Sequence, residues 1–418
     1  MDEVPQGGSR SRFKDASKII ERDFFNDVLF IDVTICLYIE LLKCITDLAA
    51  IINIIPDILN FSVFILMIRD IIDHRIKIDK WASSIFAFLF MVWITSTGFF
   101  LEGSITDRYY RYRYIFFGFL VYHICIHYMT EKYWKRLSKF LYMSQIIHTV
   151  LVTYQFAVLH TRVDMTNGIF GSLGYNNASH GLFCLIMSMI GAEGFLKKDL
   201  SKRQSVAMIL MACYSCALAE IKAFYVLFLF GVVLILLFDH KDKCILRRML
   251  LLILLGSIGL LAAFFILFKI MPENMYAFAG VGKWVAYESY ETGRAGGMGR
   301  MTQIQYIYSR VFDHNAVEAF VGKGLGADIS WVPYELGKLF LNFGILGSGL
   351  FFFFLLTRAA GSYRYRKKVP ESMVSMVMCI LTIPCMVVWN ATLNRMAMLL
   401  FVILAIGPTN SLKQTKGR

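Results

Sequence analysis

Charged residues are scarce in this chain. Asp, Glu, Lys and Arg together make up 17% of its 418 residues, whereas hydrophobic residues make up 57%. Soluble proteins usually carry about 25% charged and 45–50% apolar residues. The mean hydropathy is +0.57, and only seven prolines are present. We therefore do not expect a soluble enzyme, a nucleic-acid-binding module or a disordered chain.

The cysteines are not distributed as a disulfide-bonded protein would require. The chain has nine, and none lies in the polar segment 272–333, which argues against a disulfide framework. Cys213 and Cys216 form a C-x-x-C pair inside an apolar run, with no second pair to complete a zinc site. We interpret them as small apolar residues.

Long apolar runs dominate the sequence. A helix needs roughly 20 apolar residues to cross a bilayer, and lipid-embedded backbone must satisfy its own hydrogen bonds. The sequence therefore predicts an all-α polytopic membrane protein with about 12 transmembrane helices. The predicted spans are 24–42, 46–68, 82–101, 114–129, 140–158, 178–195, 205–219, 223–238, 249–271, 338–357, 371–389 and 394–409.

Basic residues predict the orientation, because cytoplasmic loops are enriched in Lys and Arg. A twelve-span topology places all of the basic clusters on one side, so that both termini are cytoplasmic. It leaves one long outer loop, 272–337, between spans 9 and 10 of a single membrane domain, 1–418. The clusters lie at 10–22, 69–80, 132–139, 197–203, 241–248, 358–368 and 413–418.

Cations also occur on the outer side, where this rule expects few. Most are interpreted as solvated loop charges, but together they could form a basic pocket for a pyrophosphate, because arginine forks match phosphate oxygens. These outer cations are Arg108, Arg111, Arg113, Arg162, Lys222, Lys283, Arg294, Arg300, Arg310, Lys323, Lys338 and Arg395.

Lys222 stands out among the outer cations. It lies in a turn of about three residues between two spans, so its charge is held at the membrane boundary. Ionisable groups in such places are functional candidates. A local pair with Glu220 is an equally good interpretation.

Glycine-rich segments mark three further positions. The segment 296–301 precedes a helix-like run and suits anion binding at a helix start. The segment 322–326 combines three glycines with Lys323 but lacks the spacing of a phosphate-binding P-loop. The segment 168–177 leads into a span, and a plain loop is its simplest interpretation.

Several ionisable or polar residues fall within predicted spans. His123 and His127 are four residues apart and share a helix face, but no third ligand is near them in the sequence. We interpret these two histidines as interhelical hydrogen-bonding residues. The others are Asp32, Glu40, Asp57, His148 and Gln155.

Taken together, the outer segments resemble the superfamily of Wzy-type O-antigen polymerases and O-antigen ligases, over roughly residues 160–357. That family has about a dozen spans and one long outer loop late in the chain. The motifs that carry the resemblance are Gly168 to Asn177, Ile221-Lys222-Ala223, Gly299-Arg300, Gly324 to Gly326, and Asn342-Phe343-Gly344-Ile345-Leu346-Gly347.

The chain departs from the family in two places. Lys222 stands where many members have arginine, and Pro333 stands where ligases carry a histidine before the Gly-Ile-x-Gly motif. Tyr334 and Glu335 are the nearest proton acceptors to that position. The missing histidine favours a polymerase over a ligase.

The resemblance implies transfer of an undecaprenyl-pyrophosphate-linked glycan onto a second lipid-linked repeat unit. The developing pyrophosphate charge needs fixed cations, for which we select Lys222 and Arg300, supported by Arg162 and Arg294. The acceptor hydroxyl needs a base, for which we select Glu335, with His314 in reserve. No metal or other cofactor is expected.

The expected location is the bacterial cytoplasmic (inner) membrane, with the active site on the outer face. Expected partners are lipid-linked oligosaccharides, membrane lipids and a chain-length regulator protein, but no nucleic acid. A ligase of the same superfamily is one alternative. A flippase or transporter of lipid-linked glycans is the other, although it predicts internal pseudo-symmetry that the sequence does not show.

Overall fold

The computed structural model of this chain is built from helices. It describes residues 8–46, 48–52, 54–73, 82–100, 105–172, 176–197, 200–239, 308–309, 315–325, 335–367, 369 and 371–406. No strand occurs among these residues, which confirms the predicted all-helical fold class for this part of the chain.

The elements follow one another with short connections. Two short 3₁₀ turns, η1 (Val163–Met165) and η2 (Gly168–Phe170), separate α6 from α7. The α-helices are α1 (Gly8–Ile45), α2 (Ala49–Ile52), α3 (Ile55–Ile72), α4 (Ala82–Phe100), α5 (Ile105–His127), α6 (Glu131–Ala157), α7 (Asn177–Lys197), α8 (Lys202–Leu218), α9 (Lys222–Asp239), α13 (Ala316–Val321), α14 (Glu335–Tyr365), α15 (Ser372–Val388) and α16 (Ala397–Ala405).

Helices occupy the predicted spans that fall within the described residues, with two differences. The predicted span 46–68 is divided between α2 and α3. Pro56 lies in the first turn of α3, where its missing N–H and fixed φ favour a helix start. The predicted span 394–409 begins as turns, and α16 has only nine residues. The predicted span 249–271 lies outside the described residues.

Two described helices are long and apolar enough to cross a membrane by length and composition. They are residues 177–196 of α7 and 335–365 of α14. Shorter apolar helices cover 83–97, 222–238 and 372–388. Two such helices among the described residues are well short of the twelve spans predicted from the sequence.

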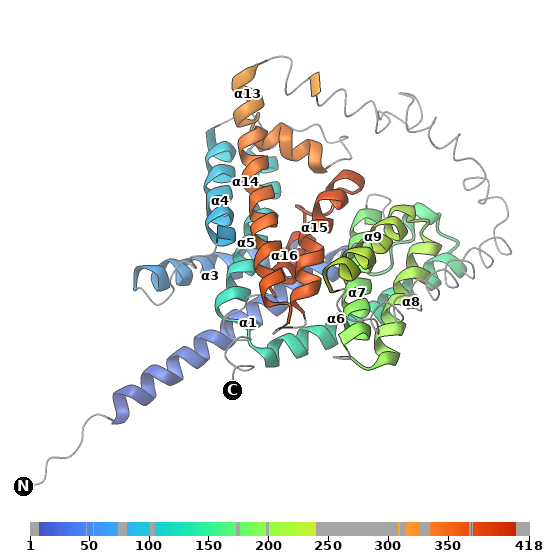
Figure 1. The fold of residues 1–418 in the computed structure, drawn as a ribbon, viewed down its shortest axis with the longest axis horizontal. Coiled ribbons are helices and arrows are strands. Elements are labelled where there is room, and N and C mark those ends of the chain that lie inside the picture. The colour runs from blue at the N-terminus through green and yellow to red at the C-terminus, as the bar shows by residue number, and fades with distance from the viewer. Residues whose placement is uncertain are drawn as a thin grey trace, which may run out of the picture.

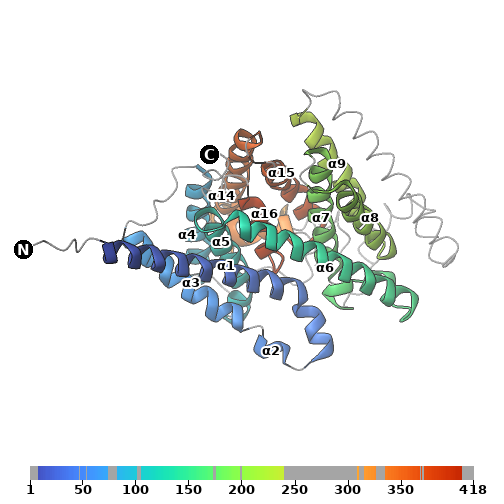
Figure 2. The ribbon, with the colours of Figure 1, turned by 90° about the horizontal axis from the view of Figure 1, so that it is seen from below.

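The helices run in two main directions. In Figure 1, α4, α14 and α7 are roughly upright, whereas α1, α3 and α6 run across them. Figure 2 shows α1 and α3 side by side along one face. The core lies around α16, whose residues are all buried and which contacts α1, α5 and α15.

Helix α14 is kinked at Gly344, whose φ of 63° and ψ of −167° are not helical. A kink deprives nearby carbonyls of their helical partners, which must then be found elsewhere. Here the N–H of Lys323 donates to Leu341 O at 2.8 Å and the N–H of Gly324 to Asn342 O at 3.0 Å. Trp93 Nε1 of α4 donates to Phe343 O at 3.1 Å.

The kink brings two sequence motifs together. The glycine-rich segment after α13 lies directly against the Gly-Ile-Leu-Gly segment of α14. A Cβ atom on Gly322 would lie 2.4 Å from Asn342 O, and one on Gly344 would lie 2.4 Å from Phe320 O. Only glycine at both positions allows this close backbone contact.

Candidate functional site

A pocket of about 320 Å³ lies where α5, α14 and the connection between α15 and α16 meet. The first turns of α14 form one wall, and the segment 389–396 closes the pocket beside it. Its lining combines cations, one carboxylate, amides and apolar side chains: Tyr110, Arg111, Tyr114, Ile115, Leu325, Glu335, Lys338, Leu339, Asn342, Phe343, Asn390, Leu393 and Asn394.

Two cations of the pocket come from different helices. Arg111 lies on α5 and Lys338 on α14, one turn after Glu335. The two positive charges are close enough to interact. Because like charges repel, an anion between them would be stabilised by both. The apolar walls strengthen this attraction, since they lower the local dielectric.

Two further arginines lie behind the pocket and have carboxylate partners. Arg113 forms an ion pair with Asp57 of α3 at 3.0 Å, and Arg395 pairs with Glu40 of α1. Both guanidinium groups lie over the ring of Tyr114, at 4.6 and 5.8 Å from its centroid. These pairs hold α1, α3 and α5 against the pocket wall.

The carboxylate of Glu335 holds the segment 389–396 in place. Its Oε1 accepts a hydrogen bond from the N–H of Leu393 at 2.6 Å. Its Oε2 accepts one from the N–H of Thr392 at 2.6 Å and another from the Thr392 hydroxyl. Glu335 is 4% exposed, so these bonds satisfy a buried charge. Its role as a base stays a prediction, and the structure adds a positioning role.

Replacing Glu335 with alanine should destabilise the fold. Two buried N–H groups would lose their acceptor, and each unsatisfied donor costs about 1–3 kcal/mol, so we expect a loss of roughly 2–5 kcal/mol. Denaturant unfolding of the purified protein in detergent measures this loss of unfolding free energy. Glu318→Ala is the control, because that carboxylate pairs with Lys323 at a partly exposed site and should contribute less than about 1 kcal/mol. Equal losses for both variants would contradict the assignment.

Comparisons with known proteins do not assign a function to the pocket. No protein-family model matches this chain, and no curated protein matches it either. The chemistry of the pocket is therefore argued from its own residues.

The predicted turn around Lys222 is confirmed. Helix α8 ends at Leu218 and α9 begins at Lys222, so three residues connect them. Glu220 has a φ of 51°, a left-handed conformation that lets the chain reverse tightly. Lys222 is exposed.

The segment of Arg162 lies near this turn. Arg162 precedes η1 and is exposed. The adjacent Val163 packs against a small apolar cluster that joins α6 to the end of α8, formed by Val152, Phe156, Ala217 and Leu218. The structure therefore brings the turn that carries Lys222 and the segment that carries Arg162 to the same end of the bundle.

The same turn is linked to the pocket through Gly181 of α7. A Cβ atom at Gly181 would lie 2.7 Å from the Trp389 ring and 3.1 Å from the Ile221 side chain. Ile221 belongs to the Lys222 turn, and Trp389 begins the segment that Glu335 holds. The two segments thus pack over one glycine.

Three predicted site residues cannot be placed. Arg294, Arg300 and His314 lie outside the described residues. Of the others, Glu335 lines the pocket, whereas Lys222 and Arg162 are not among its lining residues.

Sequence reasoning did not single out the two cations that line the pocket. Arg111 and Lys338 were grouped with the other outer cations, and Asn390 and Asn394 were not considered. A local signal did exist for Lys338, because it follows Glu335 by three residues and so shares its helix face. No local sequence pattern links Arg111 to Glu335 or Lys338.

Proposed function

We propose that this protein is a membrane glycosyltransferase that polymerises polysaccharide repeat units. It would transfer an undecaprenyl-pyrophosphate-linked glycan onto a second lipid-linked repeat unit. The observation that carries this proposal is the pocket in which Arg111 and Lys338 face a space that also contains Glu335 and three asparagines. Cations suit a pyrophosphate, and amides suit sugar hydroxyls.

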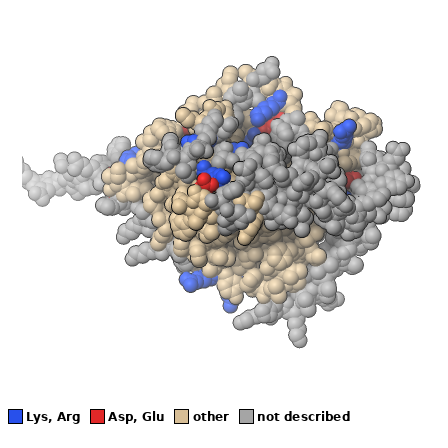
Figure 3. Space-filling model, turned by 90° about the horizontal axis from the view of Figure 1, so that it is seen from above, with Lys and Arg blue, Asp and Glu red and all other residues tan. Residues whose placement is uncertain are grey.

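The surface of the bundle supports a location in a membrane. Large apolar side chains point outward on several helices, for example Phe61 of α3 (63% exposed), Phe88 of α4 (59%), Val226 of α9 (70%) and Phe353 of α14 (55%). Soluble monomers rarely expose extended apolar surface. On the face in Figure 3, the charged side chains of the described residues form small, separated groups.

The finer topology remains part of the proposal. We propose the bacterial inner membrane, about twelve spans, cytoplasmic termini and a pocket that opens on the outer side. The basic clusters support this orientation.

The proposed reaction needs one bond made and one broken. The acceptor hydroxyl oxygen attacks the anomeric carbon of the donor sugar, and the bond from that carbon to the pyrophosphate oxygen breaks. Arg111 and Lys338 would stabilise the charge that develops on the departing pyrophosphate. The hydroxyl proton passes to a base, for which Glu335 is our candidate, through the lone pair that Oε1 retains.

A direct assay tests the proposal. Purified protein in detergent, given synthetic undecaprenyl-pyrophosphate-linked repeat units, should release undecaprenyl pyrophosphate and form products of two or more repeats. A ligase would need a different acceptor, and a flippase would form no product at all. Either result would overturn the proposal.

A genetic experiment tests it in the cell. Deleting the gene should collapse the ladder of surface polysaccharide to a single-repeat form, and Arg111→Ala or Lys338→Ala should do the same. Complete loss of surface glycan, with lipid-linked units retained inside, indicates a flippase. Long lipid-linked polymer that never reaches its final acceptor indicates a ligase.

A further inference from the structure

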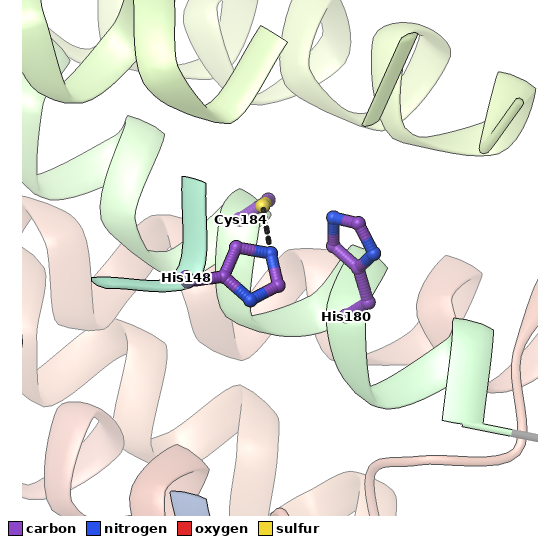
Figure 4. Close-up of side chains that lie close together, drawn as sticks. All are labelled: His148, His180 and Cys184. Carbon is purple, nitrogen blue, oxygen red and sulfur yellow. Dashed lines mark hydrogen bonds between the residues drawn. The ribbon is translucent and has the colours of Figure 1, made fainter. Parts of the chain in front are cut away.

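Three potential metal ligands converge inside the bundle, away from the pocket. They are His148 of α6 and His180 and Cys184 of α7, and one ligand atom from each lies within 4.8 Å of the others. All three side chains are fully buried. Figure 4 shows both imidazole rings and the thiol around one small region. His180 and Cys184 are four residues apart, so they share a face of α7.

His180 is the unusual member of this group. Neither of its ring nitrogens meets the geometry of a hydrogen bond, although the residue is 0% exposed and lies next to the Cys184 thiol. Buried polar atoms almost always have a partner, and an exception requires an explanation. Its ring lies edge-on to that of His148, with centroids 4.3 Å apart. A ligand that accepts electron pairs from imidazole would satisfy His180.

The other two groups already face each other. His148 Nε2 lies 3.9 Å from Cys184 Sγ, and the Cys216 thiol of α8 is within hydrogen-bonding reach of Cys184. The rings of Phe170 and Phe183 surround His148, with centroids 5.7 and 5.5 Å away. The group is therefore rich in nitrogen and sulfur, lacks carboxylates among its described ligands, and is enclosed by apolar rings.

The backbone holds His148 in position. A Cβ atom at Gly168, whose φ is 57°, would lie 2.5 Å from His148 Nδ1, so the η2 turn lies directly against the ring. Gln155 fixes that turn, accepting a hydrogen bond from the Gly168 N–H at 2.7 Å and donating to Gly171 O at 3.2 Å. The turn belongs to the glycine-rich segment 168–177, so this motif packs on His148.

We propose that His148, His180 and Cys184 form a binding site for a soft d¹⁰ transition-metal ion, Cu⁺ or Zn²⁺. Thiolate and imidazole are the ligands that these ions prefer. Binding replaces the thiol proton of Cys184, which is released, with a bond from sulfur to the ion. The site is independent of the proposed polymerase activity.

Metal binding also shifts one imidazole proton. In the structure the N–H of Ile169 donates a long hydrogen bond, 3.4 Å, to His148 Nδ1, which places the ring proton on Nε2. An ion on Nε2 moves that proton to Nδ1, and the Ile169 bond is given up. This bond is weak by its length, but its loss leaves two buried N–H groups without an acceptor, which lowers the expected affinity.

Charge balance distinguishes the two ions. Cu⁺ with one thiolate and two neutral imidazoles is neutral, which suits an apolar interior. Zn²⁺ prefers four ligands and reaches neutrality only with a second thiolate. Cys216 of α8, which interacts with Cys184, is the candidate, although it lies outside the group of three converging ligands. Cys216→Ser should therefore leave Cu⁺ binding unchanged and weaken Zn²⁺ binding.

The experiment measures metal binding to the purified full-length protein in detergent. Cu⁺ is titrated against a chromogenic chelator, and Co²⁺ serves as the spectroscopic probe for Zn²⁺, read from its thiolate charge-transfer absorption. We expect one ion per chain. His180→Gln and Cys184→Ser should each weaken binding by more than about 100-fold, the upper end of what loss of an outer-shell partner costs.

A matched variant controls for non-specific thiol binding. Cys379→Ser removes another buried cysteine, on α15, and should leave the affinity unchanged. Each variant's unfolding temperature is measured without metal, so that only folded variants are compared. If Cys184→Ser does not fold, Cys184→Ala takes its place in the comparison. The proposal is overturned if the wild type binds neither ion, or if Cys379→Ser weakens binding as much as Cys184→Ser.

Discussion

Replacing Arg111 and Lys338 together with alanine should abolish polymer formation while the protein still folds. Both side chains line the pocket, and each would stabilise the departing pyrophosphate. Removing one preorganised group of this kind costs about 10²- to 10³-fold in kcat, so the double variant should fall below detection. The rate of undecaprenyl pyrophosphate release from synthetic lipid-linked units measures the effect.

The control for this experiment is Lys323→Ala. Lys323 is another outer cation close in sequence to α14, but it pairs with Glu318 at 3.1 Å and does not line the pocket. Its loss should change the rate less than about twofold to threefold, in keeping with the small contribution of exposed ion pairs. If the double variant and Lys323→Ala behave alike, the pocket is not where the pyrophosphate binds.

Gly344→Ala should be among the most destabilising single substitutions in the chain. The φ and ψ of Gly344 (63° and −167°) lie in a region that is essentially restricted to glycine. The new methyl would lie 2.4 Å from Phe320 O and 2.5 Å from the Gly322 nitrogen, both of them backbone atoms. Strain and overpacking each cost about 1–3 kcal/mol, so we expect a loss of roughly 3 kcal/mol or more.

The same helix offers a matched control. A Cβ atom on Gly349 would meet no other atom within 4 Å, so Gly349→Ala adds the same methyl without a clash. Alanine is favoured over glycine in a helix by about 0.5–1 kcal/mol, and this variant should be neutral or slightly stabilised. Denaturant unfolding in detergent compares the two. A similar stability for both variants would show that the kink at Gly344 is not required.

The helices were predictable because the length of an apolar run is a local property. The predicted span 178–195 coincides with α7 (Asn177–Lys197), and 223–238 coincides with α9 (Lys222–Asp239). The length of the apolar run 394–409 did not predict the length of α16, because residues 392–396 form bends and turns before the helix begins. There, the N–H of Met396 donates to Asn394 Oδ1 at 3.0 Å in place of a helical hydrogen bond.

The sites were harder to predict because they join distant segments. Glu335 was selected for its place in a motif, but its bonds to Thr392 and Leu393 depend on a connection far along the chain. The packing of α5 against α16, and of α15 against α14, brings Arg111 to Lys338. Similarly, the sequence marked His148 only as a polar residue within a predicted span, because only the fold places it beside Cys184.

The shared packing over Gly181 has a mechanical consequence. Ile221 and Trp389 rest on the same glycine, so the segment that closes the pocket cannot shift without pushing on the turn before Lys222. A side chain larger than hydrogen at position 181 would therefore disturb both segments at once.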